Sequence, residues 1–346
     1  MIRIRKILFI GLGGAGQRHL RIFKDLLPAD VEFLAFRSTG KTPLLNPDFS
    51  VDNSCSLENK YGLRLCGSLR EGLDNNPDLA VIANPTVLHF DTAIKAAGRG
   101  INIFIEKPLA CSLAGANSLS RLVLSKNLYF FVSFQLRFNP QLRLVKEMLL
   151  EGRLGKIISA EFNVCSYVPG WHKYEDFKNL YACRKDLGGG VLLTEIHEID
   201  LACWYFGLPD YVYCVAGNYS GVPLEVEDTA HTILKYKDFS VQVNQSFMQK
   251  HPRRDLYISG TKGYLEWSSL DNKLLFEDYS GKKKRIITGG KFNYEGMFYS
   301  QARFFLKKAK RADKNSIKSA YASVAVVEAA KKSSQTGREC KVSRVI

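Results

Sequence analysis

The sequence predicts a two-domain α/β protein, with a doubly wound parallel sheet in the first domain and an open, mostly antiparallel sheet in the second. The chain has 346 residues, which is about the length of two domains. Over the first 135 residues, short apolar runs alternate with amphipathic stretches, a pattern typical of a parallel sheet covered by helices on both faces. Beyond residue 155, longer stretches alternate apolar with polar residues. We therefore expect domains at residues 1–135 and 136–346.

Five apolar runs in the first domain predict buried strands. They comprise residues 6–10, 31–36, 79–83, 101–105 and 129–134. Apolar residues at helical spacing predict helices at residues 15–27, 87–99 and 112–125. Because crossovers between parallel strands are right-handed, these helices would cover both faces of the sheet.

The second domain is expected to begin at the QLRFNP segment, where Asn139 suits an N-cap and Pro140 suits the first position of a helix that runs to about residue 151. Alternating strands are predicted at residues 157–165, 211–218, 229–236, 240–247, 255–259 and 263–267. Helices are predicted at residues 191–205 and twice near the end, where the Ala- and Val-rich residues 320–333 suggest a core helix. This order indicates an α/β domain with helices on one face of its sheet.

A formal net charge of +15 leaves three interpretations open: a solvated basic surface, which we favour, an anionic substrate, or nucleic acid. Two dense basic runs contribute to this charge, and their neighbouring residues suggest a hairpin tip for the first and an exposed helix face for the second. The runs are Lys282, Lys283, Lys284 and Arg285, and Lys307, Lys308, Lys310 and Arg311. No nucleic-acid-binding motif accompanies the charge, so we expect no nucleic-acid partner.

The cysteines and the hydropathy pattern indicate the cellular compartment. Eight cysteines occur without a C-x-x-C motif or a Cys/His cluster, which argues against a zinc site and a disulfide framework and favours the reducing cytoplasm. No apolar run approaches the roughly 20 residues of a membrane helix. The basic and apolar start of the chain imitates a signal peptide, but it runs into glycines and is interpreted as the first strand.

Gly11, Gly13 and Gly16 form a G-x-G-x-x-G motif between the first predicted strand and the first predicted helix. In this context the glycines, with Gly14 and Ala15 between them, permit a tight turn and a close approach of the backbone to a pyrophosphate. The helix N-terminus adds N–H donors and the positive end of its dipole. The motif predicts a Rossmann domain that binds a dinucleotide.

The end of the second predicted strand bears on which dinucleotide is bound. NAD enzymes usually carry Asp or Glu there for the ribose hydroxyls, whereas this chain has Arg37 and Ser38, followed by Thr39 and Lys41. A guanidinium can bind a 2′-phosphate, although Arg37 could also be an ordinary exposed residue. We therefore expect NADP to be preferred over NAD.

Polar residues follow the next strands at the edge where open α/β sheets bind ligands. The segment NPTVLHF covers residues 84–90, and FIEKPLA covers residues 104–110. Glu106 and Lys107 end an apolar strand, where unpaired buried charges would be costly. A lysine in a partly desolvated cleft has a lowered pKa, so we expect Lys107 to hold or accept a hydroxyl proton as hydride leaves the same carbon.

In the second domain, three glycines at residues 188–190 precede a predicted amphipathic helix. His197, Asp200 and Trp204 share one face of that helix by their spacing. A single histidine on such a face is as often a core residue as a catalytic one. The helix alone does not decide between these roles.

Taken together, GLGGAGQRHL, NPTVLH, EKP, RFNP and GGG followed by histidine resemble the glucose-fructose oxidoreductase, inositol dehydrogenase and MocA family (Gfo/Idh/MocA) over nearly the whole chain. The resemblance implies an NAD(P)-dependent oxidoreductase that forms a homodimer or homotetramer through its open sheet. It further implies roles for six residues: catalysis by Lys107 and His197, contact with the nicotinamide ribose by Asn84 and Glu106, and positions lining the cleft for His89 and Arg137.

The chain departs from the family pattern at one place. The family usually has Asp three or four residues before the histidine, where this chain has Thr194 and Leu193. Either Glu195 or Glu198 substitutes for that Asp, or the proton relay depends on Lys107 and His197 alone.

Residues 166–190 mix aromatic and basic side chains directly before the three glycines. Trp171 could stack on a sugar, and Arg184 and Lys185 could bind a phosphate or carboxylate, although the segment could equally be an ordinary lid loop. Similar stretches occur in relatives from bacterial surface-polysaccharide pathways, so the expected substrate is a sugar, nucleotide sugar or related polyol. The alternative is a non-catalytic NAD(P)-binding regulatory protein on the same fold.

Overall fold

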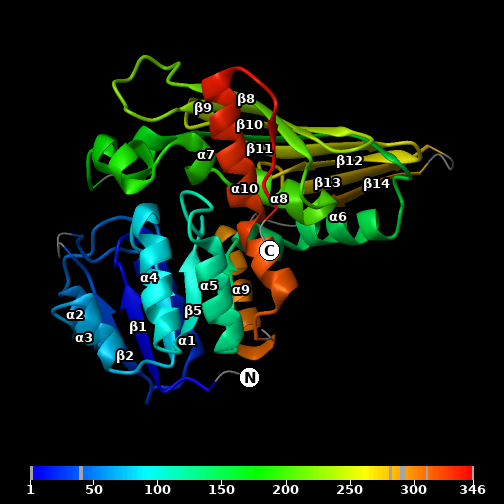
Figure 1. The fold of residues 1–346 in the computed structure, drawn as a ribbon. Coiled ribbons are helices and arrows are strands. Elements are labelled where there is room, and N and C mark those ends of the chain that lie inside the picture. The colour runs from blue at the N-terminus through cyan, green and yellow to red at the C-terminus, as the bar shows by residue number, and fades with distance from the viewer. Residues whose placement is uncertain are drawn as a thin grey trace.

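The first sheet of the computed structural model is parallel, with the strand order β3-β2-β1-β4-β5-β6 (Figure 1). The structure describes residues 3–38, 42–172, 174–279, 283–288, 293–308 and 311–344. The strands are β1 (Lys6–Ile10), β2 (Glu32–Phe36), β3 (Arg64–Leu65), β4 (Leu79–Ile82), β5 (Asn102–Glu106) and β6 (Phe130–Ser133). The order is that of a doubly wound Rossmann sheet, so the predicted fold class of this part is confirmed.

Helices cover both faces of this sheet. They are α1 (Gly14–Leu26), α2 (Leu57–Tyr61), α3 (Leu69–Asp74), α4 (Thr86–Gly98) and α5 (Ala116–Ser125). Successive residues of β1 point to opposite faces, so Leu8 packs in the cluster with α4 and α5 while Phe9 packs in the cluster with α1. The short elements α2, β3 and α3 were not predicted, because two to six residues carry too little periodicity to be recognised.

Helix α9 (Tyr294–Lys308) returns to the first domain, although its sequence position lies within the expected second domain. Phe298 and Phe305 are buried in one cluster with Phe23 and Phe104. The C-terminal part of the chain thus completes the core on one face of the Rossmann sheet.

The second sheet has the strand order β14-β13-β12-β11-β7-β10-β9-β8-β15. Its strands are β7 (Ile157–Tyr167), β8 (Tyr211–Gly217), β9 (Thr229–Lys235), β10 (Ser240–Ser246), β11 (Met248–Gly260), β12 (Gly263–Ser268), β13 (Lys273–Asp278), β14 (Lys283–Thr288) and β15 (Cys340–Lys341). Neighbouring strands are antiparallel except for β7 and β10, which are parallel. The prediction of an open, mostly antiparallel sheet is confirmed.

One face of this sheet is covered by α6 (Pro140–Leu150), α8 (His197–Phe206) and α10 (Lys314–Thr336) (Figure 1). Asn139 caps α6 through its side chain, as expected. Helix α10 buries Ala320, Val324 and Val327, which confirms the predicted core helix. The strands alternate buried with exposed residues, so the opposite face stays open and exposes Tyr211, Tyr213, Val215, Ile233 and Tyr257.

Two local predictions are wrong. The helix expected at residues 191–205 is divided into α7 (Val191–Thr194) and α8, because the carbonyl oxygens of Thr194 and Glu195 accept hydrogen bonds from the side chains of Lys107 and Gln245. The first basic run is not confined to a hairpin tip, since residues 283–285 lie in β14, where Lys283 and Lys284 pair in register with Asp278 and Glu277. Lys282 and Lys310 lie outside the described residues, and Lys307 is exposed at the end of α9.

Candidate functional site

The glycine-rich turn between β1 and α1 has the shape that a bound pyrophosphate requires. Gly11 has a φ of +89°, and a Cβ there would lie 2.6 Å from the Ala83 carbonyl oxygen. A Cβ on Gly16 would collide with the Gly11 carbonyl, whereas the space around Gly13 is open for 4 Å. No side chain of the described residues caps the N-terminus of α1, so the N–H groups of its first turn are available to an anion. The turn therefore fits a dinucleotide phosphate.

Arg37 lies at the end of β2 as expected, but it is not free. Its Nη2 is 2.5 Å from Glu58 Oε1 on α2, and both side chains are about one-fifth exposed, at 20% and 23%. Ser38 beside it is exposed, while Thr39 and Lys41 lie outside the described residues. A carboxylate therefore does lie at the end of β2, but it belongs to Glu58, 21 residues after Arg37 in the sequence.

Buried polar residues after β4 connect two neighbouring loops through hydrogen bonds. Both ring nitrogens of His89 face backbone carbonyl oxygens, at 2.7 Å from Pro108 and 2.8 Å from Asn84, and burial lowers the pKa of the ring. His89 thus links the loop after β4 to the cis-proline loop after β5, and both of its ring nitrogens already have backbone partners. The Asn84 amide donates to Thr92, while its Oδ1 has no partner in the described part of the chain.

Glu106 is buried at the end of β5 and is held as a carboxylate. Its Oε1 lies 2.5 Å from His19 Nε2, and its Oε2 accepts from the Lys107 N–H at 3.1 Å. Burial acts to raise its pKa, but the hydrogen bond and charge of His19, with Lys107 and Arg18, lower it to about 2. His19 on α1 was missed by the sequence reasoning, because a histidine on an apolar helix face is usually a core residue.

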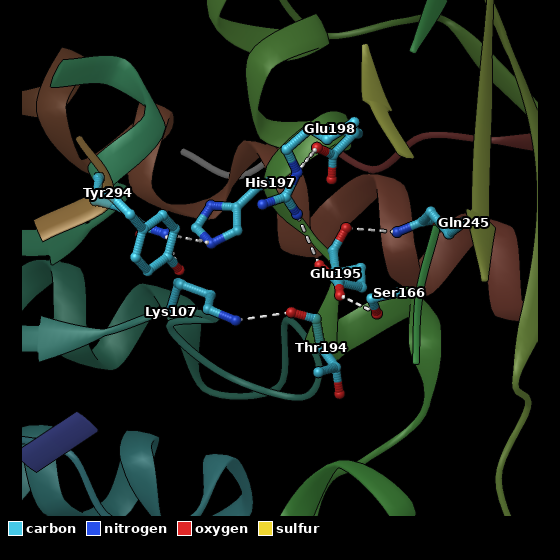
Figure 2. A network of polar contacts seen from close by, with 10 residues as sticks. Lys107, Ser166, Thr194, Glu195, His197, Glu198, Gln245 and Tyr294 are labelled. Carbon is cyan, nitrogen blue, oxygen red and sulfur yellow. Dashed lines mark hydrogen bonds and ion pairs between the residues drawn. The ribbon is translucent and has the colours of Figure 1, made fainter. Parts of the chain in front are cut away.

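Lys107 reaches from the first domain to the second. Its Nζ donates to the Thr194 carbonyl oxygen at 2.7 Å (Figure 2). The prediction of a lowered pKa is wrong: burial lowers the pKa of Lys107, but Tyr181, Glu106 and Glu195 around it raise it above its ordinary value. Lys107 is therefore a charged hydrogen-bond donor at neutral pH.

His197 is buried at the start of α8, where the chain turns after Glu195. Its Nε2 is 3.1 Å from the Gln135 amide nitrogen, which also donates to the Tyr294 hydroxyl at 3.2 Å (Figure 2). Burial, followed by the charges of Lys107, Arg254 and Arg137, lowers the pKa of His197 well below its usual value. The ring is therefore neutral at pH 7, and its Nε2 lone pair can accept a proton.

Neither of the carboxylates considered as substitutes for the family Asp joins Lys107 to His197. Glu195 accepts from Ser166 at 3.0 Å and from Arg254 at 2.8 Å, and Glu198 accepts from the same guanidinium at 2.9 Å (Figure 2). Burial raises the pKa of Glu198 to about 7. In the described part of the chain, no carboxylate therefore links Lys107 to His197 through hydrogen bonds.

The remaining expected site residues contact partners other than Lys107 and His197. Arg137 binds Asp200 through two hydrogen bonds of 2.6 and 2.8 Å and also donates to Ser319. Arg184 is exposed and pairs with Asp186 at 2.5 Å, Lys185 is exposed, and Trp171 is half-buried against the core. The sequence analysis missed Gln135, Tyr294 and Arg254. Gln135 lies in the turn after β6, Tyr294 begins α9 and Arg254 lies in β11, so only the tertiary fold brings them near His197.

No group of three His, Cys, Asp or Glu side chains among the described residues is placed to hold a metal ion. No helix there is both long enough and apolar enough to cross a membrane.

The fold and the site define an NAD-binding oxidoreductase scaffold. Residues 5–134 match the sequence model of the oxidoreductase family with an NAD-binding Rossmann fold, and residues 142–266 match that of the GFO/IDH/MocA C-terminal domain. The chain belongs to the Gfo/Idh/MocA family of oxidoreductases.

Similar proteins include enzymes with sugar substrates in their names. A 2,7-anhydro-N-acetylneuraminate hydratase of Mediterraneibacter gnavus is 25% identical over 267 residues, which cover 76% of this chain and 67% of that protein. Levoglucosan dehydrogenase in complex with NADH superposes with a TM-score of 0.80 at 20% identity, covering 98% of this chain and 99% of the other. The WlbA dehydrogenase of Bordetella pertussis, in complex with NADH and UDP-GlcNAcA, has a TM-score of 0.76 at 20% identity and covers 99% and 98%.

Proposed function

We propose that this protein is an NAD(P)-dependent dehydrogenase or reductase that acts on a CH–OH group of a sugar, nucleotide sugar or related polyol. The observation that carries the proposal is that Lys107, at the carboxyl end of β5, binds the carbonyl oxygen of Thr194, three residues before His197, and that burial, together with the charge of this lysine, lowers the pKa of His197. The names of the similar dehydrogenases support the substrate class. A non-catalytic binding protein would have no need for a charged donor beside a neutral base.

The nicotinamide, when bound, supplies or takes the hydride at the substrate carbon. During oxidation, the ammonium group of Lys107 donates a hydrogen bond to the substrate oxygen and stabilises the negative charge that develops on it. His197 accepts the hydroxyl proton at Nε2, which its neutral state allows. During reduction the proton returns from His197 to the carbonyl oxygen. Gln135, bonded to Nε2, holds the ring in place until the substrate hydroxyl replaces it.

For the cofactor, we propose that NADP binds more tightly than NAD, with its 2′-phosphate at Arg37 and Ser38. The guanidinium lies at the end of β2, where the adenosine ribose binds in this fold. Its pairing with Glu58 opposes the phosphate, so the preference should be modest. Titration of the nicotinamide fluorescence with both cofactors tests this proposal, and equal affinities would contradict it.

We propose that the other residues play supporting roles. Asn84 and Glu106 lie beside the nicotinamide ribose, with His89 bracing their loops. Trp171 faces the sugar, and the exposed Arg184 and Lys185 contribute to affinity if the sugar carries a negative charge. Arg137 and Glu195 act through the residues they bind, Asp200 and Arg254.

We further propose that the chain forms a homodimer or homotetramer through the open face of the second sheet. That face exposes Tyr211, Tyr213 and Tyr257, each more than one-third accessible, beside Val215 and Ile233. Light scattering that gives a monomer at micromolar concentration would contradict this proposal. The eight cysteines are free thiols, which supports a reducing, cytoplasmic location.

A panel of sugars and nucleotide sugars, each with NADH or NADPH, tests the reaction. Ligand binding should raise the melting temperature, and a substrate should change the absorbance of the reduced nicotinamide. Binding of a cofactor without turnover of any sugar in the panel would favour the regulatory alternative.

A further inference from the structure

Arg18 on α1 forms no ion pair with a carboxylate among the described residues, although its charge contributes to lowering the pKa of Glu106. The guanidinium groups of Arg37, Arg137, Arg184 and Arg254 each bind an aspartate or glutamate. Arg18 makes no hydrogen bond or ion pair within the part of the chain that the structure describes, and its side chain is only half-buried. Its N–H groups are therefore available to a ligand.

Three aromatic rings hold this guanidinium in place. Its central carbon lies 4.9 Å from the ring centre of Phe49, 5.5 Å from that of Tyr294 and 4.4 Å from that of Phe298. Contacts with ring faces leave the donors along the edge of a guanidinium free, and they reduce the entropy that a long side chain loses when it binds. The residue is thus positioned in advance of any ligand.

The surroundings of Arg18 place it between the glycine-rich turn and the hydride-transfer site. It lies one helical turn after Gly14 on α1, and the Phe49 ring that it contacts also packs against Gly14. Tyr294, on its other side, accepts from Gln135, which binds His197. A ligand that reaches from the α1 N-terminus toward His197 would pass this position.

We propose that Arg18 binds an oxyanion in the cleft, through charge-assisted hydrogen bonds to phosphate or carboxylate oxygens. The oxyanion has two chemical sources: the pyrophosphate of the dinucleotide or an acidic group of the substrate. The inference rests on the proposed function for the presence of these ligands, but its test needs no turnover.

The test compares Arg18→Met, which keeps much of the packing against the rings, with Arg18→Lys, which keeps the charge. Lys24→Met is the matched control, because Lys24 lies 4.1 Å from the Phe33 ring centre near the opposite end of α1. Affinity for NADH is measured by fluorescence titration, and inorganic pyrophosphate is then added to NADH-saturated protein in a thermal-shift assay.

If the cofactor supplies the oxyanion, Arg18→Met should weaken NADH binding about ten- to hundredfold, Arg18→Lys less, and Lys24→Met not at all. If the substrate supplies it, NADH affinity should be unchanged, and inorganic pyrophosphate should stabilise the NADH-saturated parent protein but not Arg18→Met. The proposal is overturned if Arg18→Met matches the parent protein in both assays. Failure of the parent protein to bind NADH would instead contradict the proposed function.

Discussion

Arg137 was expected to line the substrate cleft, but its contacts predict a structural effect when it is replaced. Its guanidinium lies against Asp200, whose side chain is 2% exposed, and it also donates to Ser319 on α10. Arg137→Met would leave the Asp200 carboxylate buried without its counter-charge. Removal of one partner of a buried ion pair typically costs about 3–5 kcal/mol, and the 20% exposure of Arg137 places the expected loss at the lower end, about 3 kcal/mol.

The assay is equilibrium unfolding in urea, with the NADH dissociation constant measured on the same preparations. Arg137→Met should lose about 3 kcal/mol of stability and bind NADH like the parent protein. The double variant Arg137→Met with Asp200→Leu should recover part of the loss, because no unpaired charge then remains buried. A loss below about 1 kcal/mol, together with a raised KM for the substrate, would refute this reasoning and return Arg137 to the cleft.

Three further predictions follow from ion pairs and from the candidate substitute for the family Asp. Glu58→Gln should release Arg37 and improve the affinity for NADPH relative to NADH by about tenfold, and an unchanged ratio in fluorescence titration would contradict the proposed role of that pair. The pKa of Glu198 is raised from 4.5 to about 7, so the folded state favours the neutral form of this carboxyl. The free energy of unfolding should therefore fall as the pH rises from about 4.5 to 7. The dependence of that free energy on pH should be weaker in Glu198→Gln. Glu195→Gln should destabilise the protein through Arg254 yet keep most of kcat, whereas a hundredfold loss of kcat would make Glu195 the catalytic substitute for the family Asp.

The fold could be predicted, and candidate chemical residues could be named, because the signals for them are local. Apolar runs predicted the positions of five strands of the Rossmann sheet. The glycine spacing predicted a tight turn, and the backbone at Gly11 and Gly16 has the geometry of such a turn. Lys107 was named as a candidate from its place at the end of an apolar strand, and His197 from the resemblance to the family. These patterns are present in the sequence without knowledge of the tertiary contacts.

The predictions failed where a side chain's partner is distant in sequence. Glu58, 21 residues after Arg37, neutralises the guanidinium that was expected to be free. The raised pKa of Lys107 depends on Tyr181 and Glu195, which lie in the other domain. The break between α7 and α8 depends likewise on Gln245 of β10, whose bond to a backbone carbonyl has no local signature. Charge pairing and helix breaks of this kind are tertiary properties.

The central claim is that Lys107 and His197 act together on one substrate oxygen, and a double-mutant cycle on kcat/KM tests it most directly. Once the panel has identified a substrate, Lys107→Ala and His197→Ala should each lower kcat/KM by about 10² to 10⁴, with cofactor affinity nearly unchanged. The double variant should lose much less than the product of the two effects, because the residues serve a single proton transfer. Near-normal kcat/KM in Lys107→Ala, or strictly multiplicative losses in the double variant, would contradict the account.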